Sequence, residues 1–170
     1  MGDDIETFEA TDAGASLTKP ISCGDLKKGY HVVIKGHPCK ISDISFSKTG
    51  KHGSAKGHMF GIDIFTGRKY EDVQPGHAAM EEPFVTREIY QLINVDEDAG
   101  SVSLLLPDGT TKDDLNLPDV PIPGQAEPSD DDRDRTEKIK TMFNDGKSIL
   151  VVVIGALGME KIMDVQEGRD

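Results

Sequence analysis

Apolar residues in the first half of the chain fall into short runs separated by turn residues such as Gly and Pro. The runs are five to nine residues long, which is typical of strands and too short for most helices. The predicted strands are Tyr30–Ile34, Cys39–Phe46, Gly57–Phe65 and Tyr70–Gln74. Because short strands and tight turns follow one another from Lys19 to Gln74, we expect a small curled β-barrel.

Two of these strands show finer patterns. In Cys39–Phe46 the apolar positions change parity part-way, which predicts a β-bulge near Ser42 and Asp43. In Gly57–Phe65, apolar residues alternate from His58 to Ile64, which is typical of a half-buried strand.

The second half of the chain combines strands with one helical pattern. Residues 118–134 hold four prolines and six acidic residues, which predicts a loop. The expected elements around it are strands Thr86–Val95, Val102–Leu106 and Thr110–Leu117, a helix over Arg135–Asn144, and strands Lys147–Ile154 and Lys161–Val165. Three strands, a helix and two further strands is the element order of an OB-fold.

Composition favours two small domains over one large domain. Hydrophobic residues make up 36% of the 170 residues and there is no Trp, so a single large core is hard to fill. Turn signals at Pro75-Gly76 and Glu81-Glu82-Pro83 mark a boundary near residue 85. We therefore expect a disordered acidic tail over 1–18, a β-barrel domain over 19–85 and an OB-fold domain over 86–170.

Charge differs between the two predicted domains. The net charge of the whole chain is −12, which by itself argues against binding to nucleic acid. Residues 20–85 nevertheless hold nine Lys and Arg against seven Asp and Glu, whereas residues 86–170 hold nine against nineteen. The basic segment is thus concentrated in the first domain.

Several common kinds of site find little support. Cys23 and Cys39 do not make a disulfide framework and are expected to be small, reduced, at least partly buried side chains. The five histidines offer no metal-ligand spacing, and the acidic run Asp130–Asp132 is expected to be a solvated loop. With no membrane span and no signal segment in the pattern, we expect a soluble protein of the cytoplasm, with the nucleus as a further candidate compartment.

Enzyme motifs are incomplete. Gly146-Lys147-Ser148 resembles the end of a P-loop, but Thr141 stands where the first Gly is required and a strand follows. His52 and Ser54 lie on one loop without the flanking residues of a catalytic pair. We therefore expect a protein that is not an enzyme.

One segment is difficult to explain as an ordinary turn. Residues 47–55 are polar and rich in glycine, and they are longer than the two to five residues that usually join paired strands. Gly50 and Gly53 surround Lys51, and Lys48 and Lys56 lie on either side. The alternatives are a solvated hairpin tip or a cationic probe for a phosphate backbone.

The residues of this loop carry a family resemblance. The runs Ser47–Lys56 and Gly61–Val73, within a match from about Ile21 to Val165, resemble the eukaryotic translation initiation factor 5A family. The resemblance implies a mostly β fold, with an N-terminal SH3-like barrel followed by a C-terminal OB-fold with one helix. Residues 119–134 then look like a loop insertion, and Ser54 and Gly57 stand where a bulkier His and a Val-like residue are expected.

The resemblance also implies a function. Lys51 aligns with the lysine that deoxyhypusine synthase and deoxyhypusine hydroxylase convert to hypusine, with the added aminobutyl group taken from spermidine. The factor itself is expected to bind no cofactor. Family members bind the large ribosomal subunit and peptidyl-tRNA, relieve stalling at proline runs and support termination. The accompanying ribosome- and tRNA-binding loop residues are Lys48, Thr49, Gly50, His52, Gly53 and Lys56. The rival interpretation is an unmodified RNA-binding module.

Overall fold

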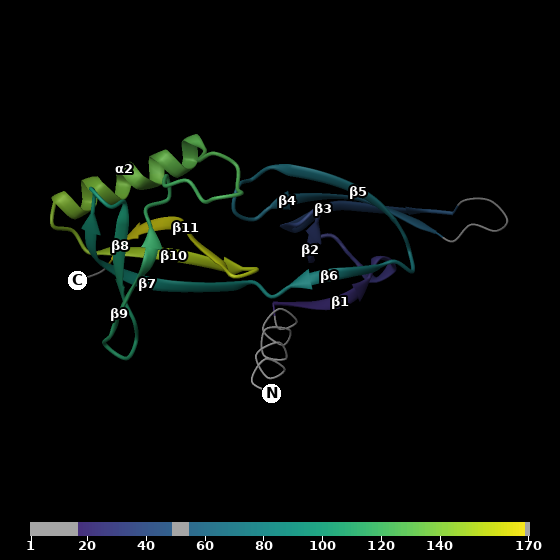
Figure 1. Ribbon diagram of the computed structural model, residues 1–170, viewed down its shortest axis with the longest axis horizontal. Coiled ribbons are helices and arrows are strands. Elements are labelled where there is room, and N and C mark those ends of the chain that lie inside the picture. Colours follow the sequence, from purple (N-terminus) through teal and green to yellow (C-terminus); the bar gives the residue numbers. More distant parts are fainter. Residues whose placement is uncertain (1–16, 49–54, 169–170) are drawn as a thin grey trace, which may run out of the picture. The chain divides into compact units, whose positions relative to one another are not determined.

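The computed structural model describes residues 17–48 and 55–168, and they form two compact units (Figure 1). The first unit takes the chain as far as Val85, together with Ala156–Gly158. The second takes Thr86–Gly155 and the chain from Met159 onward. The acidic tail predicted for 1–18 lies outside the described residues as far as residue 16, whereas Thr18 already belongs to a strand.

The first unit is a curled antiparallel sheet, a half-barrel in the segment for which the short strands predict a small curled β-barrel. Its strand order is β2-β3-β4-β5, and a two-stranded ribbon of β1 and β6 accompanies it. The strands are β1 (Thr18–Ser22), β2 (His31–Ile34), β3 (His37–Ser47), β4 (Lys56–Asp63), β5 (Lys69–Pro75) and β6 (Ala79–Pro83), with a 3₁₀ turn η1 at Cys23–Asp25. The predicted bulge in β3 is confirmed, because its register with β4 shifts between Ile41 and Asp43.

The buried face of β4 is the opposite of the one that its apolar alternation indicates. Gly57, Met59 and Gly61 are buried, whereas His58 and Phe60 are only partly covered. The reason is close packing of the backbone. A Cβ atom on Gly61 would lie 2.7 Å from Cδ1 of Ile34 and 2.8 Å from Cβ of Cys39, so the glycine is required by a thin core.

The core of the first unit is small. Both cysteines are free and completely buried in it, which confirms the prediction that they are reduced packing residues. Its buried members are Cys23, Leu26, Val32, Ile34, Cys39, Ile41, Met59 and Met80. Burial, followed by the charge of Asp63, raises the pKa of the Cys39 thiol to about 12.

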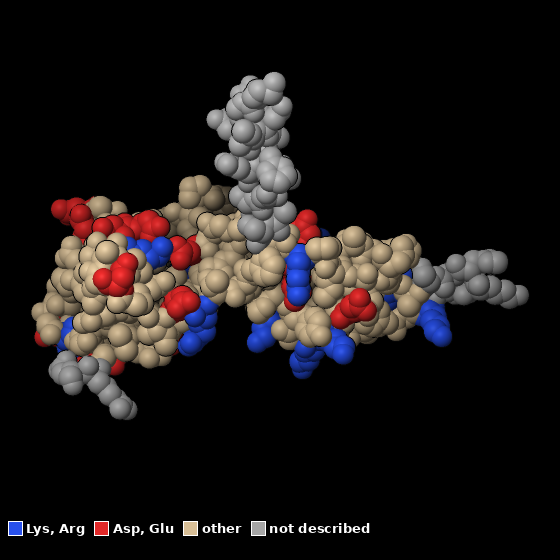
Figure 2. Space-filling model, turned by 90° about the horizontal axis from the view of Figure 1, so that it is seen from below, with Lys and Arg blue, Asp and Glu red and all other residues tan. Residues whose placement is uncertain are grey.

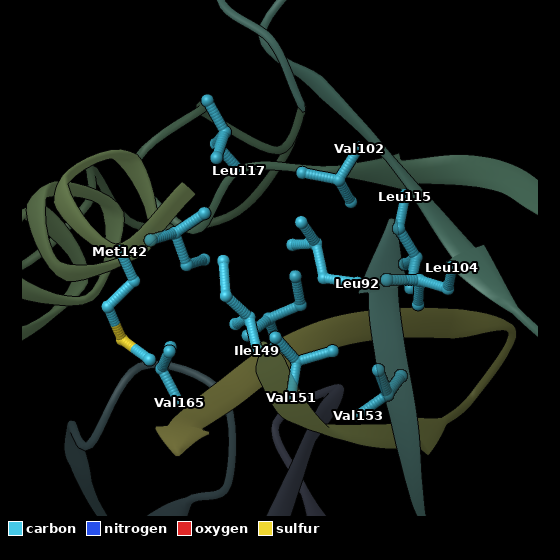
Figure 3. Close-up of a cluster of buried hydrophobic side chains, with 12 residues drawn as sticks. Leu92, Val102, Leu104, Leu115, Leu117, Met142, Ile149, Val151, Val153 and Val165 are labelled. Atoms are coloured by element: carbon cyan, nitrogen blue, oxygen red, sulfur yellow. The ribbon is translucent and has the colours of Figure 1, made fainter. Parts of the chain in front are cut away.

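The second unit has the predicted OB-fold. Its five-stranded antiparallel sheet has the order β11-β10-β7-β8-β9. The elements are β7 (Thr86–Asp96), β8 (Ser101–Leu105), β9 (Thr111–Asn116), helix α2 (Asp130–Asn144), β10 (Ile149–Ala156) and β11 (Met159–Glu167). Figure 3 shows aliphatic side chains from all five strands converging with Met142 of α2, which closes the core on one side.

Helix α2 begins five residues earlier than Arg135, the predicted start, so the predicted loop ends at Ser129. Ser129 and Asp132 form a capping box, in which each side chain accepts a hydrogen bond from the other's backbone N–H. The Asp132 carboxylate also pairs with Lys161 at 2.9 Å and Arg135 at 2.8 Å. The acidic run Asp130–Asp132 is therefore the first turn of a helix, where negative charge is favourable.

No helix within residues 17–48 and 55–168 is long and apolar enough to cross a membrane.

Candidate functional site

The predicted site lies at the junction between β3 and β4. Lys51 and its neighbours Thr49, Gly50, His52 and Gly53 lie outside the described residues. Lys48 follows β3 directly, and Lys56 is the first residue of β4. Both lysine side chains are exposed, so the structure brings two of the predicted loop cations to the same end of one ribbon.

The β3–β4 pair forms a long stem, and burial along β3 decreases toward this end. The register runs from Cys39 opposite Asp63 to Ser47 opposite Lys56. Cys39 lies in the core, whereas the chain from Ser45 to Lys48 is exposed. Because paired strands are stiff, the stem fixes the positions of Lys48 and Lys56 at its exposed end (Figure 1).

A chain of backbone hydrogen bonds fastens the loop end of this stem, at Ala55. The Gly76 N–H donates to the Ala55 carbonyl at 2.7 Å, and the Gly24 N–H donates to the Gly76 carbonyl at 2.8 Å. A Cβ atom on Gly24 or on Gly76 would lie 3.1 Å from the next carbonyl oxygen. These two glycines thus allow three backbone segments to approach closely where residue 55 joins the described chain.

Gly57, where the family resemblance leads one to expect a Val-like residue, has a structural explanation. The space that its side chain would fill is occupied by two neighbours. A Cβ atom there would lie 2.6 Å from Sγ of Cys23 and 2.9 Å from Cε1 of Phe46. Phe46 lies directly opposite Gly57 in the register, and 43% of its surface remains exposed.

Asp63 shapes the other end of β4. Its Oδ1 atom accepts hydrogen bonds from the backbone N–H groups of Phe65 at 2.8 Å and Thr66 at 3.3 Å. Its Oδ2 atom lies 3.4 Å from Nδ1 of His37, whose ring stacks on Tyr70. Asp63 is 1% exposed, so in this segment it builds the turn between β4 and β5 and is not available to a ligand.

The two units differ in the charge of their surfaces. On the face in Figure 2, Lys and Arg side chains gather on the unit that contains β3 and β4, and Asp and Glu gather on the other. Across the described ranges, no group of three or more His, Cys, Asp and Glu side chains could hold a metal ion. Gly146 has a φ of +72° in a turn that leads into β10, so Gly146-Lys147-Ser148 does not open a helix as a P-loop does.

Two family descriptions match the two halves of the chain. "Translation initiation factor 5A-like, N-terminal" matches residues 16–78. "Eukaryotic elongation factor 5A hypusine, DNA-binding OB fold" matches residues 84–166.

Full-length relatives agree with both matches. The eukaryotic translation initiation factor 5A-2 of Schizosaccharomyces pombe is 47% identical over 90% of this chain and 82% of its own length. Factor 5A-3 of Arabidopsis thaliana is 46% identical over 98% of each chain. The chain belongs to the eukaryotic translation initiation factor 5A family.

Solved structures of the 5A family share the fold. A family protein from Naegleria fowleri matches with a TM-score of 0.79 and 47% identity, over 88% of this chain and 98% of that one. The factor from Methanococcus jannaschii matches with a TM-score of 0.59 and 32% identity, over 88% and 96%. The 5A family is a family of translation factors and not of enzymes.

Sequence reasoning missed the residues that support the stem in this 5A family member. Gly24, Gly76 and Phe46 lie far apart in sequence or in unremarkable runs, and only the fold brings them to the base of the loop. Asp63 carried a usable signal, because an Asp before Thr66-Gly67 is typical of a turn in which the carboxylate binds backbone N–H groups.

Proposed function

We propose that this chain is a hypusine-modified translation factor in which Lys51 carries the modification. It binds the large ribosomal subunit and peptidyl-tRNA, promotes peptide-bond formation at stalling sequences such as proline runs, and supports termination. The observation that carries the proposal is the match of Ser47–Lys56 to the family, at the exposed end of the β3–β4 stem where Lys48 and Lys56 lie. We expect the protein in the cytoplasm with the ribosomes.

The modification is the work of two partner enzymes. Deoxyhypusine synthase transfers the aminobutyl group of spermidine to the Lys51 amine and releases the remaining three-carbon diamine. Deoxyhypusine hydroxylase then hydroxylates the new side chain with an external oxidant. A lysine suits this role because its amine is a compact nucleophile on a flexible stem. Gly50 and Gly53 lie close to Lys51 in the sequence, and glycine has no side chain that would obstruct an enzyme.

The modified side chain acts by position and not by chemistry. A long cationic group can contact the phosphate–ribose backbone of peptidyl-tRNA and reduce the entropy of a poorly placed acceptor end. Proline is a stiff and poor acceptor, so consecutive proline codons gain most. Lys48 and Lys56 anchor the loop through charge and contribute to affinity.

A reconstituted translation assay tests the proposal. Modified and unmodified proteins, together with Lys51→Arg, are compared on messages with and without proline runs. Lys51→Arg keeps the charge but cannot accept the aminobutyl group, so we expect it to fold and to behave like the unmodified protein. Equal acceleration by modified and unmodified proteins would contradict the proposal and favour the plain RNA-binding module.

A further inference from the structure

The outer face of the β3–β4–β5 sheet carries side chains that neither core uses. Residues directly opposite one another in an antiparallel sheet lie on the same face. Phe60 lies opposite Asp43 and Glu71 in the register. The neighbouring rows are Lys40, Ile62 and Lys69 on one side, and Ser45, His58 and Val73 on the other.

Aromatic and cationic groups are in contact on this face. The Lys69 ammonium lies 4.6 Å from the centroid of the Phe60 ring, a cation–π contact. The His58 ring lies 4.9 Å from Phe60 at a tilt of 42°. His58 is also hydrogen-bonded to the Glu71 carboxylate. Val73, opposite His58, is 51% exposed.

Core packing does not account for Phe60. The inward positions of β4 are taken by Gly57, Met59 and Gly61, and the close approach of the backbone leaves no room there for a ring. Phe60 therefore lies on the opposite face of the sheet, where Lys69 and His58 contact its ring and cover it only partly. The Lys69 ammonium, which contacts the Phe60 ring, can bind either the ring or a phosphate.

Charge indicates what this surface would bind. Phe60 and His58 follow one another on the outer face of β4. Lys40 and Lys69 lie beyond Phe60 on this face, and Lys56 lies beyond His58, at the start of β4. Of the two acids on the face, Glu71 is held by His58. Aromatic rings on a sheet with lysines at both ends fit an unpaired nucleotide strand, whose bases stack and whose phosphates pair with cations.

We propose that the outer face of β3–β4–β5 is a second RNA contact, which binds unpaired nucleotides by stacking a base on Phe60. The Lys69 ammonium exchanges its place over the ring for a phosphate as the base arrives. His58 and Val73 extend the platform by one further base. This contact extends the proposed ribosomal function, but it does not involve Lys51 and operates in the unmodified protein.

The test measures binding of unmodified full-length protein to a fluorescent oligouridine of about 12 nucleotides, within the site size of single-strand binders. Phe60→Ala should weaken binding roughly tenfold, as expected when one base stack is removed. Phe60→Tyr, which keeps a stacking ring, should remain within about twofold of the unaltered protein. Phe84→Ala is the matched control, because Phe84 is 49% exposed but lies outside this sheet.

Three outcomes would overturn the proposal. They are no measurable oligouridine binding by the unaltered protein, equal binding by Phe60→Ala, or equal losses for Phe60→Ala and Phe84→Ala. If Phe60→Ala proves unfolded by circular dichroism, Phe60→Leu replaces it, since Leu keeps apolar volume without a ring. It should weaken binding to the same extent.

A second arm uses isolated large ribosomal subunits. Weaker subunit binding by Phe60→Ala, with oligouridine binding unchanged, would show that the face meets a ribosomal protein and would also overturn the RNA proposal. Lys51→Arg should leave oligouridine affinity within about twofold. Failure of the Lys51 function is therefore distinguishable from failure of this contact.

Discussion

The two units fill their cores in opposite ways. The first has eight buried core residues, among them two cysteines and two methionines, and the glycines of β4 let its strands pack closely. The second has twelve, nearly all Leu, Ile and Val, closed by helix α2 (Figure 3). In the first unit the end of β3, from Ser45 to Ser47, is exposed, whereas the second unit packs its strands and helix around a larger aliphatic core. We therefore expect substitutions that enlarge a core residue to destabilise the first unit, and substitutions that leave a cavity to destabilise the second.

The largest effect is expected from a cavity in the second unit. Leu104 is completely buried, so Leu104→Ala should lower the free energy of unfolding of this unit by about 2–5 kcal/mol. NMR spectra of the backbone amides, recorded during thermal unfolding, would measure this loss of stability. Cys23 and Cys39, the only two cysteines, both lie in the first unit, so their rate of thiol labelling reports that unit alone.

Leu104→Ala lowers the stability of the second unit. If it also increases the rate of thiol labelling in the first unit by the corresponding factor, the two units unfold together. That result would contradict our proposal of separate domains that meet near Pro83–Thr86.

The buried ion pair of the second unit gives the next effect. Burial by itself raises the pKa of Asp132, but the hydrogen bonds from Lys161 and the Ser129 N–H and the charge of Arg135 outweigh it, so the pKa falls below its usual 3.8. A lowered folded-state pKa stabilises the fold above that usual value, and the contribution is lost as the pH falls through the folded pKa. Asp132→Asn should cost about 3 kcal/mol at neutral pH, because the Lys161 ammonium then faces a neutral amide in place of this carboxylate.

The pH dependence of unfolding checks this account of Asp132. Stability of the second unit should decrease below about pH 4 in the unaltered protein, and less steeply in Asp132→Asn. Asp130→Asn is the control, since Asp130 is in the same helical turn but its side chain is 91% exposed. An equal loss of stability in both variants would contradict the assignment to Asp132.

Added atoms should destabilise the first unit. Gly57→Ala places a methyl group against Cys23 and Phe46, and overpacking of this kind costs about 1–3 kcal/mol. Cys23→Ala removes the sulfur atom and should recover part of that loss in the double variant. Denaturant unfolding of the two single variants and the double variant measures the coupling. Strictly additive losses would show that Gly57 is not required by this packing arrangement.

The smallest expected effect concerns the exposed end of the stem. Lys48→Ala and Lys56→Ala should each weaken ribosome binding modestly and reduce its dependence on salt, by about one unit of slope for each phosphate interaction that is removed. Lys28→Ala, an exposed lysine in a turn of the same unit, is the control. Equal salt slopes for all three variants would show that Lys48 and Lys56 do not contact phosphates in the interface.

Much of the fold could be predicted because alternation and turn residues report strands directly. The bulge near Ser42 and Asp43 was predictable from a change of parity alone. The buried face of β4 was not, because glycines at 57 and 61 carry no hydrophobic signal although they line the core. Strands β1 and β6 were missed because each is only five residues long, shows no run of apolar residues and contains a proline.

The start of helix α2 shows a similar limit. The acids and prolines of 118–134 are typical of a loop, and they concealed the capping box of Ser129 and Asp132. Asp132 is buried because Lys161, on a distant strand, supplies its counter-charge. Such long-range pairing cannot be read from a local pattern. The loop run Ser47–Lys56 was recognised from its residues, while its support by Gly24 and Gly76 required the fold.

Peptide mass mapping of the protein purified from its native cells tests the central claim most directly. The claim is that Lys51, and not Lys48 or Lys56, carries the modification on which the function depends. We predict the added mass of one hydroxylated aminobutyl group on the peptide that contains Lys51, with fragment ions that assign it to that residue alone. An unmodified Lys51 in actively growing cells would contradict the account.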